Sequence, residues 1–126
     1  MKLLVNKQDT VEIRIYCWEK EGETEASHLK SDVPQDVNVV EQVDFVFRKP
    51  TYADSNAIIR LADIKASGED LNLPMFQEAI LKTLLQDWNI KDENEGKVPI
   101  SVAAINQLHP NLARAAVSGV LLRIRI

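Results

Sequence analysis

The chain contains few of the residues on which common active sites are built. Its one cysteine, Cys17, cannot form an internal disulfide bond. Cys17 lies in an alternating apolar segment with no basic partner nearby, which favours a small buried hydrophobic residue over a nucleophile. The four glycines are scattered and cannot form a phosphate-binding loop, and no Gly-x-Ser-x-Gly motif occurs.

Metal-binding patterns are equally sparse. The two histidines, His28 and His109, lie far apart in the sequence and have no neighbouring ligand pattern. The acidic run at residues 92–96 lacks the alternating oxygen ligands and the terminal glutamate of a calcium loop. We therefore expect no metal, no cofactor and no catalytic residue, and we predict that the protein is not an enzyme.

The composition is that of one globular domain. A chain of 126 residues with 45% hydrophobic and 27% charged residues can bury a core without metals or disulfides. The net charge of −4 argues against nucleic acid as the main partner. No apolar run approaches the roughly 20 residues of a membrane span, and the N-terminus does not resemble a signal peptide. We therefore expect neither membrane insertion nor secretion.

Alternating apolar residues predict strands in the first part of the chain, residues 1–50. Residues 11–17 show the clearest alternation, and Trp18 continues a second, partly aromatic face. Residues 37–47 alternate again until Pro50, which cannot donate to a ladder, and the two segments are expected to pair antiparallel. Residues 3–5 are a candidate for a short edge strand.

Residues 19–36 are polar and rich in glutamate, with Gly22 and Pro34 inside the segment. This composition predicts a mobile, solvated loop between the two strands. A role in binding a partner remains an alternative, because long loops in compact domains are often functional.

The second part of the chain, residues 51–126, has helical periodicity. Thr51 and Asp54 are spaced as a capping box for a first helix, and Gly68 is placed to end it. Its expected buried stripe consists of Ile58, Leu61 and Ala62. Pro74 suits the first turn of a second helix, which is expected to end near Trp88 or Asn89.

Two shorter features follow the second helix. Residues 91–97 have hairpin-like chemistry, with Gly96 available for a positive φ, and residues 98–100 are expected to be extended. Ser101 is a good N-cap for a short helix over residues 102–108, and His109 with Pro110 breaks it.

The last helix is expected to begin near Asn111. Gly119 within it should cost about 1 kcal/mol relative to alanine. Residues 120–126 are expected to continue as helix, although their alternation also allows a final strand.

Together these patterns predict an α+β fold, in which a small antiparallel sheet from the N-terminal half is packed by three to four helices from the C-terminal half. The apolar faces of the second and last helices must be covered, either by the domain itself or by another protein. We predict that they bind a partner. The candidate partner-binding residues are Phe76, Ile80, Leu81, Leu84, Leu85, Trp88, Val117, Val120, Leu121 and Ile124.

Four segments carry a resemblance to a known group of proteins. They are a strand leading into Arg48-Lys49-Pro50-Thr51, a helix leading into Trp88-Asn89, the acidic glycine loop with Val98-Pro99-Ile100, and the helix start at residues 108–113. Over residues 43–116 the chain resembles tail assembly chaperones and related baseplate assembly factors of tailed bacteriophages.

The resemblance implies a non-enzymatic role in the host cytoplasm during assembly, with a phage tail or baseplate protein, such as the tape-measure protein, as partner. The strand and acidic loop before residue 43 depart from this pattern. Because of these departures, a structural protein retained in the virion, in neck, tail or baseplate, remains an alternative. A homo-oligomer is also left open.

Overall fold

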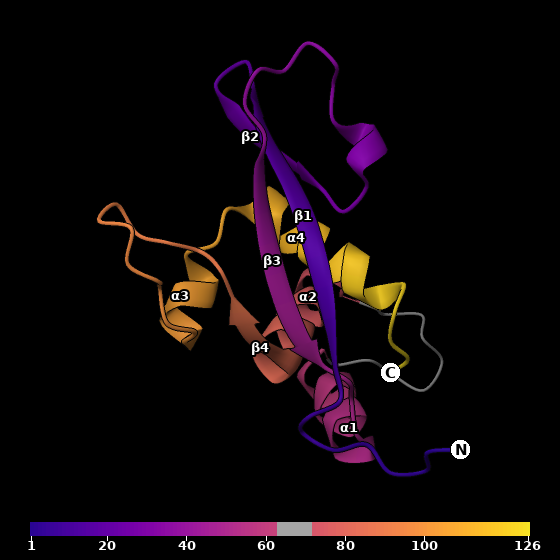
Figure 1. Ribbon diagram of the computed structural model, residues 1–126. Coiled ribbons are helices and arrows are strands. Elements are labelled where there is room, and N and C mark those ends of the chain that lie inside the picture. Colours follow the sequence, from indigo (N-terminus) through magenta and orange to yellow (C-terminus); the bar gives the residue numbers. More distant parts are fainter. Residues whose placement is uncertain (63–71) are drawn as a thin grey trace.

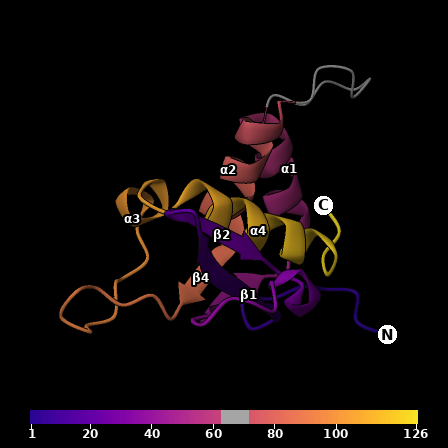
Figure 2. The same cartoon turned by 90° about the horizontal axis from the view of Figure 1, so that it is seen from above.

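The computed structural model describes residues 1–62 and 72–126. In these ranges the fold is α+β, as the sequence predicts: an antiparallel sheet, mostly from the N-terminal half, packs against helices that come mostly from the C-terminal half. The sheet has four strands in the order β2-β1-β3-β4. Figures 1 and 2 show that α2 and α4 lie on one side of this sheet.

The two longest strands are β1 (Thr10–Lys20) and β3 (Glu41–Arg48), and they pair antiparallel as predicted. Their apolar alternation is matched across the ladder, where Val11 lies opposite Phe47 and Ile13 lies opposite Phe45. These four side chains are at most 6% exposed, because their face of the sheet meets the helices. The predicted strand over residues 37–47 is shorter than expected, since residues 37–40 lie outside β3.

The prediction of a loop over residues 19–36 is wrong for residues 19–27. Glu23–Ser27 form strand β2, which pairs antiparallel with β1 and joins it through a two-residue turn. Glu21 and Gly22 occupy that turn with φ of 55° and 81°, the backbone conformation of a tight hairpin. A short 3₁₀ helix, η1 (Lys30–Asp32), follows within the connecting segment, residues 28–40.

Helix α1 (Tyr52–Leu61) begins at the predicted capping box. The Thr51 hydroxyl accepts a hydrogen bond from the backbone N–H of Asp54 at 3.1 Å, and the Asp54 carboxylate accepts one from the backbone N–H of Thr51 at 3.0 Å. Ile58 and Ala62 are fully buried as expected, whereas Leu61 is 56% exposed, so its inclusion in the buried stripe is wrong. The predicted helix end at Gly68 lies outside the described residues.

Helix α2 (Leu73–Leu84) ends earlier than predicted. Leu85–Trp88 leave the helix and form strand β4, which pairs antiparallel with the free edge of β3. The indole ring of Trp88 packs edge-on against Phe45 with the ring centroids 6.3 Å apart. Its N–H donates to the carbonyl of Val98 at 2.7 Å, so the segment after β4 is tied to the strand.

The remaining C-terminal elements follow the predictions with three differences, the first being that the short helix expected over residues 102–108 ends at Asn106. Helix α3 (Val102–Asn106) is capped by Ser101, whose hydroxyl accepts from the N–H of Ala104 at 3.0 Å. Residues 91–97 are hairpin-like, with a bridge between Lys91 and Lys97, but the positive φ is at Glu95 and not at Gly96. Helix α4 (Pro110–Leu121) ends at Leu121, and residues 122–126 form neither the helix extension nor the final strand considered above.

The segment at residues 3–5 is not an edge strand, because residues 1–9 contain no regular element. Figure 1 shows that this N-terminal segment and the C-terminal residues lie at the end of the molecule where α1 begins. The β1–β2 hairpin and the connecting segment project at the opposite end, so the chain has two distinct ends joined by the sheet.

Candidate protein-binding surfaces

The structure brings the predicted partner-binding residues together, but in the interior of the protein. Ile80, Leu84 and Val120 are fully buried in the core against the sheet. Buried with them, each at most 9% exposed, are Leu81, Leu85, Trp88, Val117 and Ile124. These eight side chains are therefore not available on the surface of the folded chain, and the prediction that they form an open partner-binding face is corrected.

The other two predicted residues differ. Phe76 is half-buried and packs against the core, whereas Leu121 is 37% exposed at the end of α4. Leu121 is followed by Leu122, which is 73% exposed, and by Ile126, which is 38% exposed. An apolar surface is thus present near the C-terminus, although it is not the helix face that the periodicity indicated.

Apolar side chains of the N-terminal segment are more exposed still. Leu3 and Leu4 are each 82% exposed, and Val5 is 40% exposed. Both views place the two termini on the same side of the molecule (Figures 1 and 2). We call the exposed apolar residues of residues 1–5 and 121–126 the terminal surface. Sequence reasoning missed its N-terminal part, because three successive apolar residues were interpreted as a strand.

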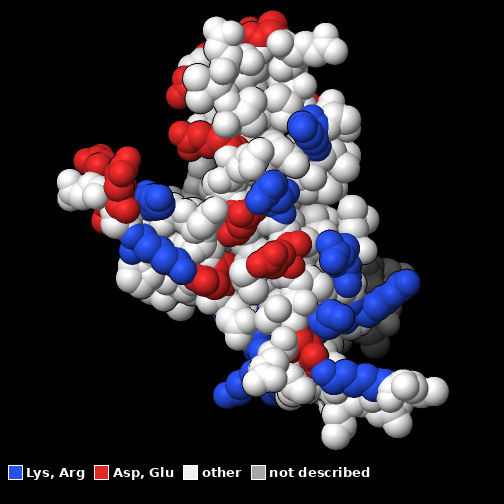
Figure 3. Space-filling model, in the orientation of Figure 1, with Lys and Arg blue, Asp and Glu red and all other residues white. Residues whose placement is uncertain are grey.

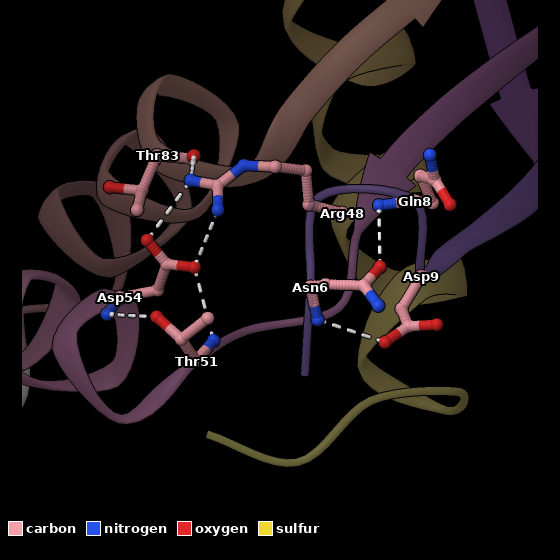
Figure 4. Close-up of polar contacts among 7 residues, drawn as sticks. All are labelled: Asn6, Gln8, Asp9, Arg48, Thr51, Asp54 and Thr83. Atoms are coloured by element: carbon pink, nitrogen blue, oxygen red, sulfur yellow. Dashed lines mark hydrogen bonds and ion pairs between the residues drawn. The ribbon is translucent and has the colours of Figure 1, made fainter. Parts of the chain in front are cut away.

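A hydrogen-bonded turn over residues 6–9 joins the N-terminal segment to the sheet. The Asp9 carboxylate accepts from the N–H of Asn6 at 2.9 Å, and the Asn6 side chain accepts from the N–H of Gln8 at 2.9 Å (Figure 4). Lys2 also pairs with Asp9, and this hydrogen bond, followed by that of Asn6, lowers the pKa of Asp9 below its ordinary value. The carbonyl of Asp9 accepts from the N–H of Lys49 at 2.7 Å, so the turn is attached to the end of β3.

A partly buried ion pair beside this turn joins three elements. Arg48 of β3 donates to both carboxylate oxygens of Asp54 at 2.6 and 3.0 Å, and to the carbonyl of Thr83 in α2 at 2.7 Å (Figure 4). Burial alone would raise the pKa of Asp54, but the hydrogen bonds from Arg48 and Thr51 outweigh it and lower that pKa. The donors and acceptors of this cluster satisfy one another, which is the arrangement of a structural link between β3, α1 and α2.

A cavity of about 860 Å³ lies at the opposite end of the molecule, between the β1–β2 hairpin and the connecting segment. It is lined on one side by Trp18 and on the other by residues including Val37 and Val39. Four carboxylates, Glu19, Glu21, Asp36 and Glu41, and one amine, Lys20, also line it. We call this space the hairpin cavity.

Trp18 faces away from the helices, because it follows the alternation of the outward-facing side chains of β1, yet it is only 9% exposed. Its indole N–H is buried and has no acceptor among the described residues. The sequence did signal this region, since an aromatic residue on a polar strand face indicates that the face is partly covered. Burial, and then the charge of Glu41, raise the pKa of the neighbouring Cys17, so this thiol is not an activated nucleophile.

Charge is divided unequally between the two ends. Residues 17–41 carry seven carboxylates and two lysines, a net charge of −5. The terminal segments contribute four basic residues, Lys2, Lys7, Arg123 and Arg125, all with exposed side chains. Figure 3 shows basic side chains gathered at the lower right, where the terminal segments lie, and acidic side chains over the upper part.

No group of three His, Cys, Asp or Glu side chains within residues 1–62 and 72–126 is placed to hold a metal ion. Over the same ranges, no helix has the length and apolar character needed to cross a membrane. A scan against protein-family models finds no match, and searches of curated proteins and of solved structures find none either.

Proposed function

We propose that this chain is a non-enzymatic assembly protein of a tailed bacteriophage that binds a tail or baseplate protein, such as the tape-measure protein, in the host cytoplasm. The observation that carries the proposal is the terminal surface, where large apolar side chains are exposed next to basic ones. Leu3, Leu4 and Leu122 are each more than 70% exposed. Adjacent exposed apolar residues rimmed by charge are typical of a protein-binding site.

The binding surface proposed here replaces the buried helix faces of α2 and α4. Burying one leucine side chain in a partner contributes roughly 1.5–3 kcal/mol before the costs of association are subtracted. The resemblance over residues 43–116 supplies the class of partner, and the terminal surface supplies the contact.

The test is capture of the partner from phage-infected cells, followed by mass spectrometry. The affinity tag belongs between Glu93 and Asn94, in the exposed 91–97 loop, so that neither terminal segment is altered. Wild-type protein is expected to capture a tail or baseplate component. Replacing Leu4 and Leu122 together by aspartate should weaken capture by roughly a hundredfold or more, because both apolar contacts are lost.

A matched control is Val102→Asp, which changes a 58% exposed apolar residue on α3, away from the terminal surface. It should leave capture unchanged. Circular dichroism checks that the variant changed at Leu4 and Leu122 is folded like the wild type. If this folded variant still captures the partner, the terminal surface is not the binding site.

A second candidate is a structural protein retained in the virion. The opposite charges of the two ends favour it, since such a chain suits an assembly of several like copies. Analysis of purified particles separates the candidates: stoichiometric copies indicate a structural protein, whereas absence from finished particles indicates an assembly chaperone.

A further inference from the structure

We propose that the hairpin cavity of one copy binds the N-terminal segment of a second copy, so that copies associate head to tail. The inference goes beyond the proposed function, since it assigns the N-terminal part of the terminal surface to a second copy of this chain. Its occupant is the segment of residues 1–7, which is apolar in the middle and has Lys2 and Lys7 near its ends.

The cavity has the size and lining of a binding site. Its volume of about 860 Å³ falls within the range of roughly 300–1,000 Å³ that ligand pockets occupy. Apolar walls are supplied by Trp18, Val37 and Val39, and Val39 is 69% exposed. The cavity can therefore accept apolar side chains as well as charged ones.

The charge of the cavity selects a basic occupant. Four carboxylates and one lysine line it, and none of these carboxylates makes an ion pair within the described part of the chain. All four carboxylates are exposed, so solvent screens their mutual repulsion, but the negative field that they share favours a segment that carries cations. Lys2 and Lys7 supply two such cations on one short segment.

The indole N–H of Trp18 gives a second reason for an occupant. A buried donor without an acceptor costs roughly 1–3 kcal/mol, and that of Trp18 has none among the described residues. Trp18 lines the hairpin cavity, and an extended peptide carries a carbonyl at every residue, so an entering segment brings acceptors close to this indole. A bare metal cation or a simple amine would not.

The N-terminal segment is suited to leave its own chain. Residues 1–5 contain no regular element and no member of the core cluster. The pair between Lys2 and Asp9 is exposed, and exposed ion pairs contribute only about 0–1 kcal/mol. Lys2 can therefore exchange its ion pair with Asp9 for one with a carboxylate of the cavity at little cost in free energy.

The segment cannot reach the cavity of its own chain. The strand β1 places Trp18 roughly 30 Å from Asp9, given a rise of about 3.3 Å per residue. The residues from Lys2 to Asp9, fully extended, span at most about 25 Å, and the turn at Asn6–Asp9 shortens that reach. The occupant must be a second copy, and an interface between two different surfaces leads to rings or open chains.

The first experiment measures mass by sedimentation velocity over a concentration series at low and high salt. Wild-type protein is expected to associate, and salt should weaken the association because it depends on charge. The variants K2E/K7E and E19K/E41K should each lose self-association by about tenfold or more, and mixing the two should restore a mixed complex. Lys91→Glu with Arg114→Glu, the same charge change at exposed sites elsewhere, should leave association unchanged.

The second experiment locates the contact. A synthetic peptide of residues 1–9 is titrated into the whole protein while the two tryptophan indole N–H signals are followed by NMR. The Trp18 signal should move, whereas that of Trp88, which is bonded to Val98, should not. A peptide with both lysines replaced by glutamate should have no effect.

Three results would each overturn the inference. They are a wild-type protein that stays monomeric at every concentration, a mixture of the two charge-reversed variants that does not associate, and a Trp18 signal that the peptide does not move. Partner capture from infected cells is measured in parallel with E19K/E41K. If the wild-type protein does not self-associate but still captures its partner, the head-to-tail inference fails and the proposed function stands.

Discussion

Replacing Gly119 by alanine sets two physical effects of opposite sign against each other. Gly119 lies inside α4, where glycine costs about 1 kcal/mol relative to alanine, so helix propensity alone predicts a more stable protein. The structure predicts the reverse. A Cβ at this position would lie 2.7 Å from Cγ2 of Ile13 in β1 and 3.1 Å from Cβ of His28.

The magnitude follows from these contacts. Carbon atoms in contact prefer about 3.5–4.0 Å, so the new methyl group must push α4 away from β1 or force Ile13 out of its position in the core. Overpacking of this kind costs roughly 1–3 kcal/mol. Helix propensity returns about 1 kcal/mol of this cost. Gly119→Ala is therefore expected to lower the free energy of unfolding by up to about 2 kcal/mol.

Urea unfolding followed by circular dichroism measures this change, with equal m-values confirming that only stability has changed. Ser118→Ala, at the exposed neighbouring position, is the control and should stabilise by up to about 0.7 kcal/mol. In an Ile13→Ala background the closer obstruction is gone and only the 3.1 Å contact with His28 remains, so Gly119→Ala should destabilise less than it does in the wild type. If Gly119→Ala stabilises the wild-type chain as Ser118→Ala does, the close approach of α4 to β1 is refuted.

Three further predictions concern stability. Asp54→Asn should lower the free energy of unfolding by roughly 1–3 kcal/mol at pH 7, because Arg48 loses its charged partner. The pKa of Asp54 is lowered in the folded protein, so the stabilisation by its carboxylate is complete above the unfolded pKa of about 3.9 and is lost as the pH falls through the lowered folded pKa. Urea unfolding at several pH values should therefore show the difference between variant and wild type shrinking in acid. Ser101→Ala removes the N-cap of α3 and should cost about 1 kcal/mol in thermal unfolding. Val117→Asp places a carboxylate at a site that is 1% exposed and should abolish cooperative unfolding, whereas a folded Val117→Asp variant would contradict the burial of that face.

The parts of the fold that depend on neighbouring residues were predicted from the sequence. The alternation in β1 and β3, the capping box at Thr51 and the cap at Ser101 are all confirmed. Each rests on residues within a few positions of one another, where the side chain and backbone it serves are set by local geometry. The pairing of β1 with β3 was also predictable, because residues 11–17 and 37–47 were both expected to be strands and are joined by a connection long enough for an antiparallel pair.

The errors fall where a distant element decides the local structure. Leu84, Leu85 and Trp88 fit a helix by spacing, but β3 offers a free edge, and pairing with it turns residues 85–88 into a strand. The strand β2 has no apolar period because glutamates fill it, and only the Glu21-Gly22 turn and the partner strand β1 make it a strand. The polar composition indicated a solvated loop, whereas only Glu23 of β2 is exposed and Ser27 is buried.

The candidate site shows the limit of periodicity most clearly. A regular apolar stripe requires only that something cover it, and in α2 and α4 the sheet does so, as the burial of Ile80 and Val117 shows. A binding surface has no reason to repeat the period of the fold, because its partner lies outside the chain. The residues that break their own pattern are therefore the better guide: Trp18, buried on a polar strand face, and Leu4 and Leu122, exposed where no element covers them. On this argument, the substitutions that alter binding without altering stability belong at these irregular positions, and those in the regular stripes alter stability first.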